Sequence, residues 1–220
     1  YVMVGTGVKS VDVVSDPLET VEPQPAQWLN KEFLSIQNPR TIAVQFPEAT
    51  NSWQLTRVSE TNDWQLADAR PGEKLDATKI SSVTSPFSSA SFNDVTPLKP
   101  DITTNRTVLT VETFDGFTYV ATIGPKEDDD YPVTFAISAK LPTERVADKA
   151  EKPAEKAKLD KAFADENAKL TEKLAKEKQF TNWVYQLPAY SVDQILKTRS
   201  QLLEEPKKAD TAKSDKTGGG

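Results

Sequence analysis

The sequence predicts an α+β domain, built from duplicated antiparallel sheet-plus-helix units with a charged helical insertion. Three observations predict it. Runs of alternating apolar and polar residues, typical of half-buried strands, recur between residues 41 and 137. Ala, Lys, Glu and Asp dominate residues 142–179 at helical spacing. The order strand, turn, strand, capped helix is predicted twice, which indicates an internal repeat.

The composition excludes several classes of chemistry. The chain has 220 residues and contains neither His nor Cys. Ser-His-Asp and Cys-His nucleophile systems, His/Cys zinc sites and disulfides are therefore impossible within it. Its net charge of −6 disfavours nucleic-acid binding, which needs a basic face. The length allows one domain over residues 1–205, and the polar residues 206–220 are predicted to be a disordered tail.

The first 66 residues are predicted to hold short strands and one short helix. Loose alternation over residues 1–14 predicts strands around a turn at Gly5-Thr6-Gly7. Asp16 can cap a helix that ends before Pro23. The next three strands, over residues 41–46, 53–58 and 64–66, form an antiparallel meander. Its first strand places Ile42, Val44 and Phe46 on one face.

A helix and a loop are predicted to follow the meander. Asp76 caps an amphipathic helix that buries Ile80, Val83 and Phe87. Residues 88–106 are rich in Ser, Asp, Asn and Pro, which favours a loop.

A hairpin and a third strand are predicted over residues 107–141. Strands at 107–114 and 117–123 flank Asp115-Gly116, a dipeptide typical of a primed turn. The strand at 131–141 places Val133, Phe135 and Ile137 on one face.

Residues 142–179 are predicted to form a helical arm that contributes little to the core. Pro153 divides the arm into a short helix and a long one. The apolar stripe of the long helix holds Leu159, Phe163, Leu170 and Leu174. We expect this stripe to pack on the short helix around Val146; the alternative is a coiled-coil arm that grips a partner.

The last elements complete the predicted repeat. Residues 183–187 read as a strand, and Ser191 is expected to cap a final helix. That helix carries Val192, Ile195, Leu196, Leu202 and Leu203. Residues 1–22 are expected to overlay residues 131–137 plus 183–203, with the arm inserted in the second copy.

Three groups of residues carry a family resemblance. They are Trp28-Leu29-Asn30-Lys31-Glu32-Phe33-Leu34 with Ile42-Ala43-Val44; Trp53-Gln54-Leu55-Thr56-Arg57 with Trp64-Gln65-Leu66; and Asp115-Gly116 with Ile123-Gly124. Their order over residues 1–205, the arm excepted, resembles the bacterial domain-of-unknown-function family 4340. Members look like membrane-anchored envelope proteins, often encoded beside ABC-transporter components of the gliding type.

That resemblance implies a place and a class of partner, and no catalytic residues. It implies a periplasmic or otherwise extracytoplasmic domain, anchored to the membrane by a segment upstream of Tyr1. It also implies a protein partner in the envelope, such as an ABC-transporter component. The charged arm departs from the family and puts any shared partner surface near residues 140–180 in doubt.

No motif in the chain predicts a catalytic, cofactor or metal site. Residues 127–130 could offer carboxylates to calcium, but they lack the spacing and Gly of an EF-hand loop. Residues 5–7 lack the third glycine of a nucleotide fingerprint. Asn105-Arg106-Thr107 fits a glycosylation sequon, and Asp12 with Asp16 could be a glycosidase pair. With 33 acidic residues in the chain, such pairs arise by chance.

We therefore expect a non-catalytic binding or scaffolding domain, not an enzyme. The alternatives are a carboxylate-based hydrolase and a carbohydrate-binding module. Core or half-core packing is expected for Trp28, Trp53, Trp64 and Trp183, and the alternative is an exposed ligand platform. Two acidic side chains facing each other across a deep pocket would favour the hydrolase.

Overall fold

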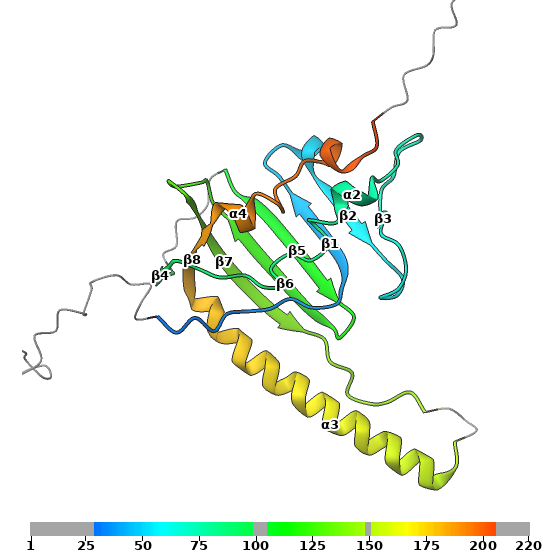
Figure 1. Cartoon of the computed structure of the whole chain (residues 1–220). Helices are drawn as coiled ribbons and strands as arrows, with labels where there is room; N and C mark the ends of the chain where they lie inside the picture. The colour runs from blue at the N-terminus through cyan, green and yellow to red at the C-terminus, as the bar shows by residue number, and fades with distance from the viewer. Residues whose placement is uncertain (1–28, 99–104, 148–150, 206–220) are drawn as a thin grey trace, which may run out of the picture. The chain divides into compact units, whose positions relative to one another are not determined.

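The computed structural model describes residues 29–98, 105–147 and 151–205, and it shows one eight-stranded antiparallel sheet (Figure 1). The strand order is β3-β2-β1-β5-β6-β7-β8-β4. The strands are β1 (Pro39–Gln45), β2 (Trp53–Thr56), β3 (Gln65–Leu66), β4 (Asp94–Pro97), β5 (Thr107–Thr113), β6 (Phe117–Ile123), β7 (Asp130–Ala139) and β8 (Trp183–Pro188). All of them belong to the unit that starts at Glu32.

Helices connect or flank these strands, so the chain is α+β as predicted. The helices are α2 (Ala77–Ile80), α3 (Pro153–Glu177) and α4 (Ala189–Val192), with short 3₁₀ turns η1 (Ala49–Asn51), η2 (Lys178–Asn182) and η3 (Arg199–Leu202). The predicted elements of residues 1–28, and the tail from residue 206, lie outside the described residues.

The core lies on one face of the sheet. Alternate residues of β5 and β6 are buried, as a half-buried strand requires. The segments at 32–38 and 80–92 cross this face (Figure 1), and the chain from α4 to η3 adds Val192, Ile195 and Leu202 to the core. The ring of Phe33 lies within 6 Å of four other aromatic rings, those of Phe92, Phe135, Phe180 and Tyr185. We call this side the covered face.

The turn between β5 and β6 differs from the predicted primed turn. Gly116 has φ +88°, whereas Phe114 and Asp115 have negative φ, so three residues rather than two connect the strands. This is a turn with glycine in the left-handed position. A Cβ on Gly116 would lie 2.6 Å from the carbonyl oxygen of Lys140, so both φ and close approach require glycine.

Several helix predictions are wrong for identifiable reasons. α2 spans four residues, although Asp76 caps it and Ile80, Val83 and Phe87 are buried as expected. Ser191 lies inside α4 and caps nothing, and a capping box at Thr198 begins η3 instead. Short turns, rather than one continuous helix, bury the apolar residues there.

The predicted loop at 88–106 contains a strand. β4 pairs with β8, with Asp94 opposite Gln186 and Pro97 opposite Trp183. A polar stretch becomes an edge strand here because a partner far along the chain supplies the hydrogen bonds.

The arm has one helix rather than a helical hairpin. Pro153 occupies the first turn of α3, where its missing N–H is harmless. Residues 140–147 are not helical, and Val146 is 95% exposed, so the predicted packing of the stripe on a short helix is wrong. An irregular return segment takes that place: the Arg145 guanidinium contacts Asp160 at 2.8 Å, and Asn167 donates to the Pro142 carbonyl at 2.6 Å.

Candidate functional site

The second face of the sheet, which we call the open face, has a nearly uncharged surface. The pairing register places most of its side chains in three rows, and a short fourth row at the β4 end holds Pro132, Gln186 and Asp94. The first row is Gln54, Ala43, Thr110, Val120 and Ala136; the second is Thr56, Thr41, Glu112, Thr118 and Ser138; the third is Gln45, Val108, Thr122, Thr134, Val184 and Thr96. Glu112 is the only charged residue in the three rows.

The lack of charge on the open face is unusual for this chain. Charged residues make up 27% of the sequence, and a half-exposed strand face usually carries its share of them. The side chains of the central strands β5 and β6 on this face are partly exposed. Glu112 is paired with Arg40, whose Nη2 lies 3.2 Å from its carboxylate. The open face is therefore a broad patch of small and β-branched side chains without net charge.

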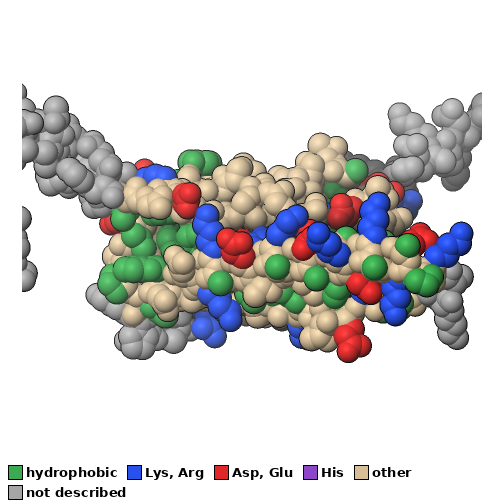
Figure 2. Space-filling model, turned by 90° about the horizontal axis from the view of Figure 1, so that it is seen from below, with side chains coloured by type: hydrophobic (Ala, Val, Ile, Leu, Met, Phe, Trp, Pro, Cys, Tyr) green, Lys and Arg blue, Asp and Glu red, His purple; other side chains and the backbone are tan. Residues whose placement is uncertain are grey.

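A hollow lies on this face beside the β4 end of the sheet. Its volume is about 450 Å³, and Val120, Thr122 and Ala136 are among its lining residues. Leu98, which follows β4, stands at its margin and is 51% exposed. Lys178 of η2 lies on its other side. Figure 2 shows hydrophobic side chains gathered at the end of the molecule where α3 runs into η2, while Lys, Arg, Asp and Glu follow the arm.

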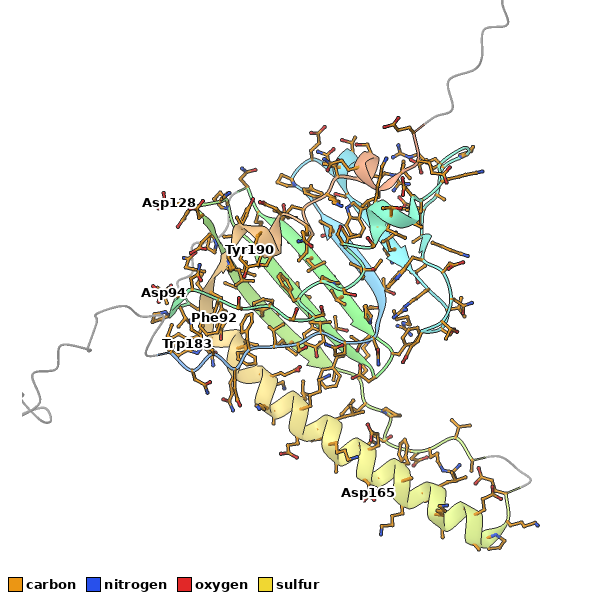
Figure 3. The ribbon with its side chains drawn as sticks, in the orientation of Figure 1. Phe92, Asp94, Asp128, Asp165, Trp183 and Tyr190 are labelled. Atoms are coloured by element: carbon orange, nitrogen blue, oxygen red, sulfur yellow. The ribbon has the colours of Figure 1, made fainter. Side chains whose placement is uncertain are left out.

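Trp183 adds an exposed aromatic ring at the same edge. Its side chain is 40% exposed and pairs across the ladder with Pro97. In Figure 3, Trp183 lies at the edge of the sheet with Phe92 and Asp94. The expectation of core or half-core packing is thus wrong for Trp183, whose ring is exposed, and right for Trp64, which is partly buried. It is also right for Trp53, which is buried and donates its indole N–H to the Lys197 carbonyl at 2.6 Å.

The covered face holds a buried carboxyl group that the sequence did not indicate. Glu177, the last residue of α3, is 7% exposed, and the Tyr119 hydroxyl donates to its Oε2 at 2.7 Å. Burial raises the pKa of Glu177, although the Tyr119 hydrogen bond and the charge of Lys173 act in the opposite direction. Burial, with the Glu177 hydrogen bond, raises the pKa of Tyr119 above its usual range.

A second hollow adjoins this carboxyl group. It has a volume of about 410 Å³ and lies between residues 32–37 and the end of α3, with Phe33 and Phe180 in its wall. A carboxyl group with a raised pKa in a hollow can transfer protons, so among the described residues this is the place that fits a hydrolase.

The acidic groups nearest to Glu177 are already held by cations. Asp115 accepts a hydrogen bond from the Thr113 hydroxyl and lies 3.3 Å from Lys173 Nζ. Glu32, on the rim of the hollow, lies 3.3 Å from Lys176. The side chains of Glu177 and Tyr119 join α3 to the sheet, and the described neighbours Asp115 and Glu32 are both paired with lysines.

An ion cluster fastens the end of the described chain. Arg199 is buried and donates to Asp68 at 2.8 Å and to Glu73 at 2.6 Å. The hydrogen bonds from Arg199 and from the Arg70 backbone lower the pKa of Glu73 to about 2. The cluster ties η3 to the loop that follows β3.

Some of the candidate sites that the sequence suggested lie within the described residues, and others lie outside them. Residues 5–7, Asp12, Asp16 and Trp28 lie outside the described residues. Residues 127–130 form the tight turn that begins β7, closed by backbone bonds between Glu127 and Asp130. Across the described ranges, no group of three or more acidic side chains is placed to hold a metal ion. Asn105 is exposed.

Comparisons with family models, with curated proteins and with solved structures found no significant match to this chain. The resemblance to family 4340 therefore stays a prediction. None of the helices in the described part of the chain has the length and apolarity needed to cross a membrane.

Proposed function

We propose that this chain is a non-catalytic binding or scaffolding domain that holds a protein partner on its open sheet face. The observation that carries the proposal is the composition of the three rows, which hold one charged residue, itself already paired. Protein interfaces exclude charged residues from their centre and use aromatic and apolar anchors. Leu98 supplies such an anchor at the border.

The family resemblance supports the setting that we propose for this activity. The domain acts outside the cytoplasm, held to the membrane by an anchor upstream of Tyr1. Its partner is an envelope protein, with components of a gliding-type ABC transporter as the first candidates.

We also propose that the chain arose from a duplicated sheet-and-helix unit with a charged insertion. The presence of α3 in the connection between the neighbouring strands β7 and β8 supports the insertion. Replacing residues 142–169 by a short Gly-Ser linker tests it while keeping Lys173 and Glu177. The shortened chain is expected to fold and to keep the β-sheet component of its far-UV circular-dichroism spectrum. Loss of cooperative unfolding would show that the arm belongs to the core.

Cross-linking in cells of the source organism tests the binding function. A photo-reactive amino acid in place of Ala136, on the open face, is expected to give a discrete covalent adduct that a Val120→Glu change abolishes. The matched control carries the same amino acid in place of Val146 on the arm and gives no such adduct. Absence of an adduct from Ala136 would overturn the proposal.

The alternative function, a carboxylate-based hydrolase, rests on Glu177 alone. A hydrolase that uses this group would lose its activity in Glu177→Gln and keep its fold. We propose the binding function instead because Tyr119 occupies the Glu177 carboxyl group and the neighbouring acids are paired.

A further inference from the structure

We infer that the partner on the open face is a second copy of this chain, packed sheet against sheet about a two-fold axis. The inference rests on the proposed binding function and names its occupant. Three features of the open face support it: its charge, its shape and its area.

The charge of the open face permits pairing with itself. In a two-fold interface the same patch meets itself, so a patch with net charge repels its own copy. The chain carries a net charge of −6, which opposes the approach of two copies through most of its surface. The rows around Thr110, Val120 and Thr122 avoid that repulsion, and the pair of Glu112 with Arg40 adds no net charge at one border. At the β4 end, Asp94 and Lys178 carry charges of opposite sign.

The shape of the face is self-complementary at its edge. An isologous interface needs both a projection and a recess on the same surface, because each copy supplies one to the other. Leu98 is about half exposed and lines one side of the hollow whose lining also includes Val120 and Ala136. Leu98 of one copy can therefore enter the hollow of its partner, and the two-fold axis repeats the contact.

The area of the face suits a weak dimer. The three rows hold 16 residues on strands about 4.8 Å apart, with outward residues about 6.8 Å apart along each strand, which gives roughly 500 Å² per copy. The total of roughly 1,000 Å² lies in the range of weak, transient interfaces. Thr, Ala and Val are small enough to let two sheets approach to about 10 Å, as in a β-sandwich. We therefore expect a dimer that dissociates on dilution.

The same rows disfavour other occupants. A carbohydrate platform needs aromatic rings, and the three rows contain none. A nucleic-acid surface needs Lys and Arg, and the rows contain neither.

Sedimentation velocity of the full chain over a concentration series tests the inference. The chain is expected to sediment as a dimer, at twice the 24.3 kDa of one copy, and to dissociate in the micromolar range. Ala136→Glu is expected to raise the dissociation constant at least about tenfold, because the interface gains two negative charges, one from each copy, that repel each other. Val146→Glu, on the arm, is the matched control and leaves the constant unchanged.

A second measurement separates loss of pairing from loss of folding. The chain has no Cys, so the double variant Leu98→Cys with Ala136→Cys places one thiol on each side of the inferred contact, and Val146→Cys is the control on the arm. Oxidation is expected to link position 98 of one copy to position 136 of the other and to give no link through position 146, with the thermal midpoint of the reduced protein unchanged. A chain that stays monomeric at every concentration, or a dimer that Ala136→Glu leaves intact, overturns the inference.

The cross-linking experiment distinguishes the two proposals. An adduct of two copies of the chain supports both. An adduct with a different protein overturns the second-copy inference and leaves the binding function standing. No adduct overturns both.

Discussion

The two faces of the sheet differ in what fixes their composition. Phe135 and Ala136 are neighbours on β7 and point to opposite sides: Phe135 is buried against the rings of Phe33, Phe87 and Tyr185, whereas Ala136 is exposed. Folding explains the covered face, because burial of large apolar side chains stabilises the domain. It does not explain the open face, where charged residues would keep the chain soluble at no loss of packing. The difference supports the proposal that association, rather than stability, selects the composition of the open face.

The largest expected effect compares Phe135 with its neighbour. Phe135→Ala is expected to lower the free energy of unfolding by about 3–5 kcal/mol, because it removes a buried ring and leaves a cavity. Ala136→Ser is expected to change it by less than about 0.5 kcal/mol. Urea unfolding of both variants, at concentrations where the chain is monomeric, measures the difference. Similar losses in both would mean that the second face is also packed.

The buried carboxyl group gives the next largest effect. Glu177→Ala is expected to lower the free energy of unfolding by about 1–3 kcal/mol, because the buried Tyr119 hydroxyl loses its acceptor. Glu177→Gln keeps an acceptor and is expected to have a smaller effect. The Ala variant should be as stable as wild type only if water replaces the carboxylate.

The pH dependence of Glu177 has a defined sign. Its pKa is raised in the folded state, so the contribution from its neutral form is present below the unfolded pKa and is lost as pH rises through the folded pKa. Wild type should therefore lose stability relative to Glu177→Gln across that range. Unfolding of both proteins in a series of buffers from acid to neutral pH checks the sign, and a difference that shrank with rising pH would contradict it.

The sheet could be largely predicted from the sequence because its signal is local. Alternation over residues 41–46, 107–114 and 131–141 corresponds closely to β1, β5 and β7, and the apolar positions found there form the covered face. The open face follows from the same alternation, read at the other positions of each strand. Its neutrality becomes visible only when the register aligns Thr110 with Val120 and Ala43.

The errors concern elements that distant contacts create. β4 exists because β8 pairs with it, and residues 88–98 carry no strand pattern of their own. The end of the described chain holds apolar residues at spacings that fit a helix, yet separate turns bury Ile195 and Leu202. Glu177 was missed because it lies in a charged stretch; its position three residues after Leu174, on the stripe of α3, was the available signal.

Two ion pairs, Arg199 with Glu73 and Arg40 with Glu112, are expected to differ in how much they contribute to stability at acid pH. The pKa of Glu73 is lowered from 4.5 to about 2, so its contribution to stability is present above pH about 4.5 and is lost as pH falls towards 2. Glu73→Gln is expected to remove this acid-dependent loss. Glu112→Gln, in the exposed pair with Arg40, is the matched control on the open face. Acid unfolding followed by circular dichroism measures both, and an unchanged acid midpoint in Glu73→Gln would contradict the assignment.

The smallest expected effect separates folding from association on the open face itself. Thr118→Val keeps the shape and the β-branching of the side chain and replaces a half-exposed hydroxyl by a methyl group. Because water solvates that hydroxyl in the monomer, the free energy of unfolding is expected to change by less than about 0.5 kcal/mol. In the inferred dimer the same methyl group lies between two sheets, so the dissociation constant of that dimer is expected to fall rather than rise. Unfolding below the dissociation constant and sedimentation above it measure the two quantities separately. A loss of more than about 1 kcal/mol in the monomer would show that the Thr118 hydroxyl is buried and hydrogen-bonded within one copy, and the face would then not be open there.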